Sequence, residues 1–334
     1  MKKIICLLCI ALGWSLSTIA FSSTCLIFVH GKQTDSGTYT SYNTARNYWK
    51  KGSKDFIKTA TRNFATSYYV VGYNGTRPYF ESQTAGEVAN EIVRATNGQT
   101  DSGGKKCSKS HSQGGEFIVV AHSMGNTIMD YILGNARSND PNYNKNGWPF
   151  STVGSRISLV YSLSGAHRGS EGADSVCGDG GAICNFLGGF IQDCDDATYW
   201  LRSSNDVQVR NNANAPYRTI WLTGGYEAIF GASACLSGED DGVVQFASIY
   251  ACGGDPTRSY NKSNVCGNGN KQESSGFKNL DTAHENHSNI RDASDSATRR
   301  QIPDGIWKCG GFPCPANTIV DSSMSTAEFI SQLY

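Results

Sequence analysis

The chain has 334 residues and a formal net charge of zero, and only 17% of its residues are charged. This length is enough for one large α/β domain with an ample core. The balanced charge gives no basic surface and so argues against a nucleic-acid partner. The 37 glycines are typical of a loop-rich extracellular protein.

The first 24 residues have the features of a secretory signal peptide. Two lysines follow Met1, an apolar run covers residues 4–14, and small residues at 18–22 offer cleavage sites. The run is short for a membrane span, and no other apolar segment of the sequence is long enough. We therefore expect a secreted protein, extracellular or periplasmic, without a transmembrane segment in its mature form. We expect residues 25–334 to form one domain and the protein to be a monomer.

Ten of the 12 cysteines follow the predicted signal peptide, and an even number after export favours disulfide bonds. Zinc is the competing interpretation, but the sequence has no C-x-x-C pair and no matching histidine spacing. We expect a local bridge between Cys309 and Cys314. Cys177, Cys184 and Cys194 cannot all pair among themselves, so at least one of them should pair with another segment.

Apolar runs alternate with helical periodicity along the chain. Strands are expected at 25–29, 68–73, 117–120, 157–163 and 217–223, with a weaker candidate at 276–280; helices are expected at 42–50, 54–66, 81–96, 124–134 and 325–333. This alternation predicts a mostly parallel, doubly wound sheet of about six strands. Residues 170–214 interrupt the pattern with a Cys-containing insertion that includes an apolar island at 186–191. The insertion is either a cap or lid or a surface excursion pinned by disulfides.

A serine lies in the tight turn between the strand at 117–120 and the following helix. The turn reads Ala121-His122-Ser123-Met124-Gly125, a variant of the G-x-S-x-G nucleophile elbow. The residues two before and two after the serine must be small, since strand and helix nearly touch there. Gly125 meets this demand, and Ala121 stands where glycine is usual. We predict that Ser123 is a nucleophile and that the His122 side chain leaves the opposite side of the elbow.

A serine hydroxyl needs a base to take its proton, and in this type of fold an acid and a histidine follow the serine in that order. Asp241 precedes Gly-Val-Val after the fifth strand and is the preferred acid, with Asp240 as the reserve. A solvated acidic turn or a cation site is the alternative reading. His287 is the preferred base, with His284 as the alternative, and a surface histidine is the non-catalytic reading.

Acyl transfer also needs donors for the oxyanion that develops in the transition state. One expected donor is the backbone N–H of Met124, at the start of the helix after Ser123. The other is the backbone N–H of Lys32, which follows His30-Gly31 after the first strand. The glycine lets this loop approach the substrate closely, and His30 is expected to brace it.

Together these segments resemble the bacterial secreted α/β-hydrolase lipases and esterases, including the related extracellular polyester depolymerases. The matching pieces are FVHG at 28–31, AHSMG at 121–125, AHRGS at 166–170, DGVV at 241–244 and NH at 286–287. The resemblance implies an α/β-hydrolase fold and a serine hydrolase of carboxylic esters that needs no cofactor. It implies Ser123 as nucleophile, His287 as base and Asp241 as orienting acid. It also implies Lys32 and Met124 as oxyanion donors.

The resemblance leaves the substrate open. The expected partner is an ester or lipid of the triacylglycerol type or a similar apolar ester, in solution or at an interface. Many such lipases have an apolar residue where this chain has Lys32, which argues against long-chain lipids. Some bind calcium through an aspartate two residues after the histidine; Asn289 occupies that position here, so no metal is predicted.

Alternative functions fit the same residues. A polyester depolymerase or an acyltransferase would use the same three residues. A non-catalytic, disulfide-rich secreted binding protein on a hydrolase scaffold is the alternative of another class, and it would be expected to have lost at least one of them.

Overall fold

The computed structural model describes residues 23–33, 40–50, 52–63, 65–136, 147–178, 193–203, 218–224, 241, 243–244, 248, 280–282, 287–294, 298–302, 308–309, 312–313, 318–322 and 325–332. The predicted signal peptide (except its last two residues), the apolar island at 186–191 and the reserve residues Asp240 and His284 lie outside the described residues. No helix in the described part of the chain is both long enough and apolar enough to span a membrane.

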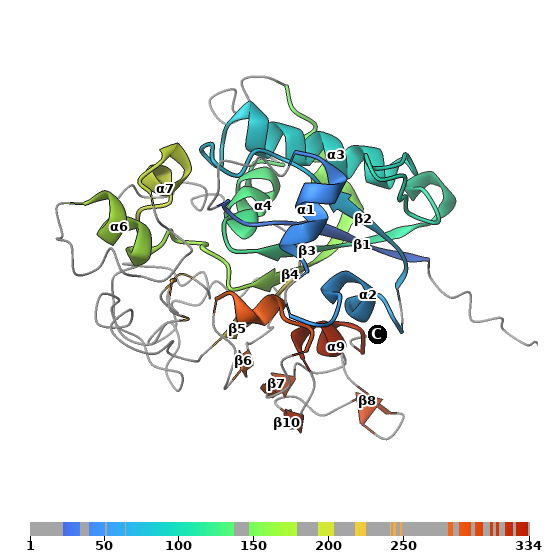
Figure 1. Ribbon diagram of the computed structural model, residues 1–334. Coiled ribbons are helices and arrows are strands. Elements are labelled where there is room, and N and C mark those ends of the chain that lie inside the picture. Colours follow the sequence, from blue (N-terminus) through green and yellow to red (C-terminus); the bar gives the residue numbers. More distant parts are fainter. Residues whose placement is uncertain are drawn as a thin grey trace, which may run out of the picture.

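A parallel sheet forms the centre of the molecule (Figure 1). Within the described residues its strand order is β2-β1-β3-β4-β5-β6, and every neighbouring pair is parallel. The strands are β1 (Thr24–Val29), β2 (Ala65–Val71), β3 (Glu116–His122), β4 (Ile157–Leu163), β5 (Arg218–Gly224) and β6 (Leu280–Thr282). Strand β1 is buried along its whole length, as its continuous apolar run predicts. The predicted parallel α/β sheet is thus confirmed.

Helices cover both faces of the sheet, so the fold is doubly wound. Alternate residues of β1 point to opposite faces: Ile27 and Val29 belong to one apolar core, and Leu26 and Phe28 to the other. The first core includes α3 (Glu87–Thr96), α4 (Met124–Gly134) and α5 (Phe150–Arg156). The second includes α1 (Tyr42–Tyr48), α2 (Phe56–Ala60) and α9 (Thr326–Ile330).

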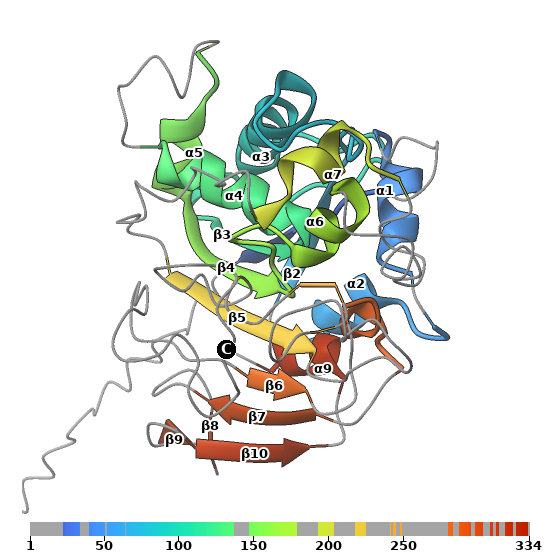
Figure 2. The ribbon, with the colours of Figure 1, turned by 90° about the vertical axis from the view of Figure 1, so that its left-hand side faces the viewer.

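The last part of the described chain adds strands that the sequence did not predict. Strand β7 (Thr298–Ile302) pairs antiparallel with β10 (Thr318–Ser322), and β8 (Lys308–Cys309) pairs with β9 (Phe312–Pro313). Figure 2 shows β7 next to β6 and β10 on the other side of β7, beyond the end of the central sheet. These strands are short and have at most two consecutive apolar residues, so they lack the longer apolar runs that identify the buried strands of the sheet.

Four of the five predicted helices have different limits in the structure; α1 ends at Tyr48 and α9 covers Thr326–Ile330. The helix expected at 54–66 is only α2, because its buried side ends at Ala60 and three polar residues, Thr61, Arg62 and Asn63, follow. The helix expected at 81–96 begins with a π turn, η1 (Ser82–Gly86), ahead of α3. At the junction the indole of Trp148 occupies the space that a Cβ on Gly86 would need.

Two disulfide bonds are present among the described residues. Cys25 at the start of β1 pairs with Cys107 in the loop before β3, and Cys177 at the end of α6 (Glu171–Cys177) pairs with Cys194. The second bond uses two of the three cysteines that the sequence grouped together; Cys184 lies outside the described residues. Cys314 does as well, so its bridge to Cys309 stays a prediction.

The two disulfides should differ in their effect on stability. We expect replacement of both Cys25 and Cys107 by serine to lower the free energy of unfolding by about 1–1.5 kcal/mol more than replacement of both Cys177 and Cys194. The reason is that the first bond spans 82 residues and the second spans 17, so the first restricts the unfolded chain more. Urea unfolding of both variants measures this difference. An equal or larger loss for the shorter loop would contradict it.

Candidate active site

Ser123 lies in a strained turn between β3 and α4. Its backbone has φ 52° and ψ −128°, which is rare for a residue with a side chain. The turn is held by main-chain contacts, since the Ser123 N–H donates to the Leu163 carbonyl at 3.0 Å. The side-chain amide of Asn126 donates to the carbonyls of Leu163 and Ala121, at 3.2 and 3.1 Å. The serine is thus presented at the carboxyl end of the sheet by the predicted nucleophile elbow.

Close contact with the loop after β1 explains the small residue at position 125. A Cβ on Gly125 would lie 2.5 Å from the His30 carbonyl oxygen and 2.8 Å from that of Val29. Ala121 is fully buried, so the position on the other side of Ser123 accommodates a methyl group. The elbow therefore requires glycine on its helix side and tolerates alanine on its strand side.

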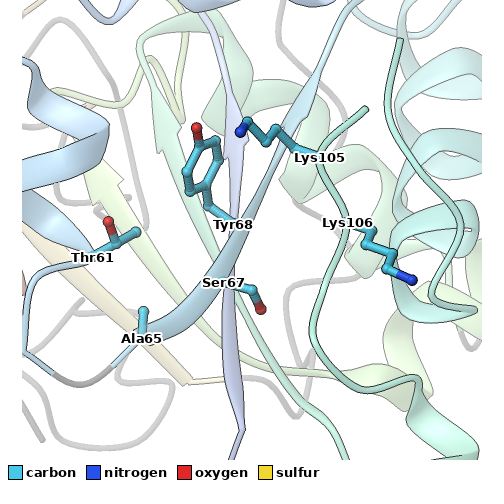
Figure 3. Close-up of a pocket in the computed structure, with 6 residues that line it drawn as sticks. All are labelled: Thr61, Ala65, Ser67, Tyr68, Lys105 and Lys106. Atoms are coloured by element: carbon cyan, nitrogen blue, oxygen red, sulfur yellow. The ribbon is translucent and has the colours of Figure 1, made fainter. Parts of the chain in front are cut away.

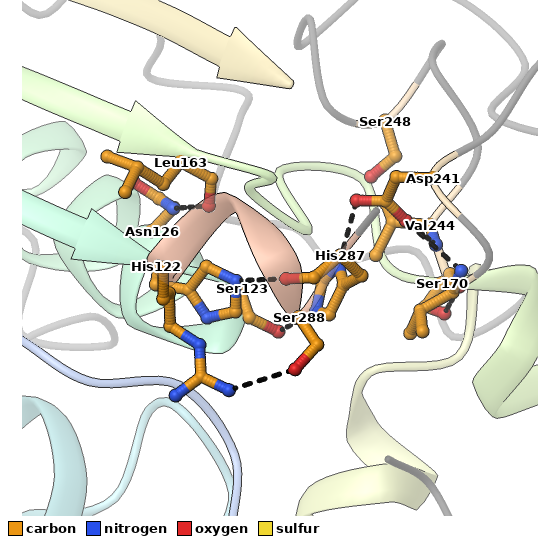
Figure 4. A network of polar contacts seen from close by, with 12 residues as sticks. His122, Ser123, Asn126, Leu163, Ser170, Asp241, Val244, Ser248, His287 and Ser288 are labelled. Atoms are coloured by element: carbon orange, nitrogen blue, oxygen red, sulfur yellow. Dashed lines mark hydrogen bonds and ion pairs between the residues drawn. The ribbon is translucent and has the colours of Figure 1, made fainter. Parts of the chain in front are cut away.

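The structure brings Ser123, His287 and Asp241 into one chain of hydrogen bonds (Figure 4). His287 Nε2 lies 2.9 Å from Ser123 Oγ, and His287 Nδ1 lies 2.8 Å from Asp241 Oδ2. Asp241 is 0% exposed and His287 3% exposed. The Asp241 carboxylate can only accept a hydrogen bond, so the proton of the neutral imidazole stays on Nδ1. That leaves Nε2 to accept the serine proton.

Asp241 is held by its own loop. Its second oxygen, Oδ1, accepts from the backbone N–H groups of Val243 and Val244, at 3.1 and 2.8 Å. The Asp241 carbonyl accepts from the backbone N–H of His287 at 2.9 Å. The carboxylate therefore faces the imidazole and is not part of a solvated acidic turn.

The loop after β1 packs directly against the elbow. A Cβ on Gly31 would lie 2.8 Å from the Cβ of Ser123, so only glycine fits. The ring of His30 stacks on that of Tyr73 with 3.9 Å between centroids, and the Tyr73 hydroxyl donates to the His30 carbonyl at 2.5 Å. Burial, together with nearby Tyr48, raises the pKa of Tyr73 well above its usual value, so the hydroxyl keeps its proton. His30 and Tyr73 together brace this loop.

Lys32 follows Gly31 in the loop after β1, and Met124 follows Ser123 in the elbow. Met124 begins α4, and within the described part of the chain neither its backbone N–H nor that of Lys32 donates a hydrogen bond. These two N–H groups are the predicted oxyanion donors.

The Lys32 side chain turns toward α7 (Asp196–Trp200). Its ammonium lies 2.9 Å from an oxygen of Asp195, the residue that caps α7, and only 7% of the side chain is exposed. Next to this pair, Arg77 bonds Asp196 at 2.7 Å. The positive charge of Lys32 is therefore neutralised within the protein, and α7 is connected to the loop after β1.

The surroundings of His122 were not predicted from the sequence. Its ring lies 4.8 Å from that of His287, and its Nε2 is 2.7 Å from the His287 carbonyl oxygen. On the other side, its Nδ1 is 2.5 Å from the Tyr48 hydroxyl. These partners are 165 and 74 residues away in sequence, so no local pattern points to them.

The AHRGS segment has a structural role that its sequence does not reveal. His167 bonds Asp130 at 2.6 Å through Nδ1 and Ser162 at 2.7 Å through Nε2. Ser162 is fully buried in β4, so this second Ser–His–Asp chain offers no reactive hydroxyl. Farther along the segment, the Ser170 hydroxyl donates to the Val243 carbonyl at 2.6 Å. The segment therefore connects α4 with the loop that carries Asp241.

No group of three or more metal-binding side chains occurs within the described residues. A cleft of about 340 Å³ is lined by Thr61, Ala65, Ser67, Tyr68, Lys105 and Lys106 (Figure 3). It lies where β2 begins, whereas Ser123 follows the carboxyl end of β3. This cleft is therefore separate from the candidate active site.

No protein-family model matches the sequence, and no curated protein matches it. Solved structures to which this chain is similar include the mature lipase BlEst2 of Bacillus licheniformis (TM-score 0.49, 16% identity, 81% of this chain and 87% of that one). EstA from Clostridium botulinum has a TM-score of 0.49 and 15% identity, over 81% of this chain and 83% of that one. The Staphylococcus hyicus lipase has a TM-score of 0.47 and 13% identity, over 80% of this chain and 89% of that one.

The contact at Gly125 gives a stability prediction. We expect Gly125→Ala to lower the free energy of unfolding by about 1–3 kcal/mol, because the new methyl group would overlap the His30 carbonyl. Ala121→Gly is the matched control on the other side of Ser123 and should cost about 1 kcal/mol or less. Urea unfolding compares the two. A Gly125→Ala variant as stable as the wild type would show that the elbow has more room than these distances allow.

Proposed function

We propose that this protein is a serine hydrolase that cleaves carboxylic esters through an acyl-enzyme on Ser123. The observation that carries the proposal is the hydrogen bond from Ser123 Oγ to His287 Nε2, with Asp241 on the opposite ring nitrogen. A serine hydroxyl becomes an effective nucleophile only when a positioned base takes its proton. The strained backbone of Ser123 and the burial of Asp241 give further support, because both fit a nucleophile elbow with an orienting acid.

In the first half of the reaction, Ser123 Oγ would attack the ester carbonyl carbon while His287 Nε2 takes the hydroxyl proton. The negative oxygen of the tetrahedral intermediate would accept hydrogen bonds from the backbone N–H groups of Lys32 and Met124. Asp241 would stabilise the imidazolium and hold its tautomer. When the intermediate collapses, the alcohol would leave with the proton from His287.

In the second half, His287 would take a proton from water, and the resulting hydroxide would attack the acyl group on Ser123. Collapse of this second intermediate would release the carboxylic acid and return the proton to Ser123. Every proton in this cycle moves through His287, so the mechanism needs no cofactor.

We further propose an apolar ester, such as an acylglycerol, as substrate. The charge of Lys32 argued against such a substrate in the sequence, but the ion pair with Asp195 neutralises that charge. Tyr199 and Trp200 on α7 are the large apolar side chains exposed in the described part of the chain, at 43% and 38%. These exposed aromatic residues belong to a segment attached to the loop after β1, which carries the proposed oxyanion donor Lys32. They would suit contact with a lipid surface.

The described parts of the insertion, residues 170–178 and 193–203, would then belong to a cap. Its support is the attachment of α7 through Asp195, Asp196 and the backbone N–H of Ala197, which donates to the Thr76 carbonyl at 3.3 Å. Secretion is also proposed, because the signal-like start and the two described disulfides both fit an oxidising compartment.

Labelling with a fluorophosphonate tests the proposed triad. We expect the wild type to label stoichiometrically and Ser123→Ala not to label. His287→Ala and Asp241→Asn should slow labelling by roughly 10⁴-fold, because each removes the activation of the serine. His284→Ala and Asp240→Asn are the matched controls and should label at the wild-type rate. A wild type that does not label would refute the enzyme proposal, and loss of labelling in His284→Ala would reassign the base.

A substrate panel tests the proposed ester class. We expect p-nitrophenyl esters to be hydrolysed with acyl chains beyond acetate, and emulsified triglyceride to be hydrolysed as well. A polyester film should be a poorer substrate than the triglyceride. Release of p-nitrophenol and of fatty acid measures these rates. Activity confined to short soluble esters would contradict the lipid proposal while leaving the esterase in place.

A further inference from the structure

His122 is a buried histidine that touches the proposed base from the side away from Asp241. Its ring is 0% exposed, and its Nε2 lies 2.7 Å from the His287 carbonyl oxygen. A carbonyl oxygen only accepts hydrogen bonds, so Nε2 must carry a proton and donate it. In the neutral ring Nδ1 then accepts from the Tyr48 hydroxyl, 2.5 Å away. The two contacts of His122 therefore have fixed directions.

This contact completes a clamp on the backbone of His287. The N–H of His287 donates to the Asp241 carbonyl at 2.9 Å, and its C=O accepts from His122. The peptide groups on both sides of the His287 Cα are thus held, while Asp241 holds the imidazole at Nδ1. His122 directly precedes Ser123 in the chain. One side chain therefore connects the elbow that carries the nucleophile with the main chain that carries the base.

Tyr48 and Arg291 support the contact between His122 and His287. The Arg291 guanidinium lies 3.9 Å from the centre of the Tyr48 ring and donates to the Tyr48 carbonyl oxygen. Arg291 belongs to η8 (Asn289–Arg291), which follows His287, and it is 7% exposed. Arg291, in the segment that follows His287, thus contacts Tyr48. Tyr48 is hydrogen-bonded to His122, and His122 is hydrogen-bonded to the His287 carbonyl.

We propose that His122 is a positioning residue whose Nε2–H sets the place of His287 relative to Ser123. This inference rests on the proposed function. Proton transfer from Ser123 requires the imidazole to stay at hydrogen-bond distance, and a displacement of about 1 Å can cost roughly 100-fold in rate. The alternative role for His122 is that of a buried side chain whose hydrogen bonds contribute only to stability. The two roles predict different results for two near-isosteric amides.

The amide nitrogen of glutamine lies as many bonds from the backbone as Nε2 of histidine, whereas that of asparagine corresponds to Nδ1. His122→Gln therefore retains a donor for the His287 carbonyl, and His122→Asn retains only a group that faces Tyr48. We expect His122→Asn to lower kcat on a soluble p-nitrophenyl ester and the rate of fluorophosphonate labelling by roughly 10- to 100-fold, with KM changed less than about twofold. His122→Gln should restore both rates to within several-fold of the wild type.

His167→Gln is the matched control, since His167 is also buried and its two ring nitrogens bond Ser162 and Asp130 rather than a residue of the proposed triad. It should lower the melting temperature and leave the labelling rate of the folded protein unchanged. Tyr48→Phe keeps the Nε2 donor of His122 but loses the hydrogen bond to Nδ1. Its labelling rate should therefore lie between those of His122→Gln and the wild type.

Melting curves of every variant separate folding from positioning. Equal rates for His122→Gln and His122→Asn, at equal stability, would overturn the inference and leave the proposed triad intact. A wild type that does not label would overturn both.

Discussion

The close packing of the loop after β1 and the end of β4 against Ser123 is the constraint on which the rest of the site depends. The Ser123 backbone is strained, and it is held by contact with the loop after β1 at Gly31 and by the Leu163 carbonyl at the end of β4. Gly125 allows this approach because it has no Cβ. Since β1, β3 and β4 are neighbours in a parallel sheet, their carboxyl ends meet at one edge, and the elbow lies in the middle of that edge.

Around this fixed point, the proposed catalytic groups come from distant parts of the chain. His287 is 164 residues from Ser123, and Asp241 is 46 residues from His287. Main-chain groups hold both residues. The backbone N–H of Val244 donates to the Asp241 carboxylate, and the N–H and C=O of His287 are both hydrogen-bonded. The buried polar groups of Asp241 and His287 are thus hydrogen-bonded, which is what a low-dielectric site requires.

Much of the fold could be predicted from the sequence, because buried parallel strands are continuous apolar runs and the elbow motif needs a strand and a helix around it. The order of Ser123, Asp241 and His287 was also readable, and the structure brings the three within hydrogen-bond distance, although their roles stay predictions. The limits of α2 were predicted wrongly, because the buried side of the helix ends at Ala60 and polar residues follow it. The bonds of His122 and the ion pair of Lys32 join residues too far apart for any local pattern to reveal them.

Trapping of the acyl-enzyme tests the proposed nucleophile most directly. The wild type is mixed with a p-nitrophenyl ester, quenched in acid within the first turnover, digested, and examined by peptide mass spectrometry. We predict a burst of p-nitrophenol equal to the enzyme concentration and an acyl group on the peptide that contains Ser123. Turnover without a burst and with that peptide unmodified, or an acyl group on another residue, would contradict the proposed mechanism.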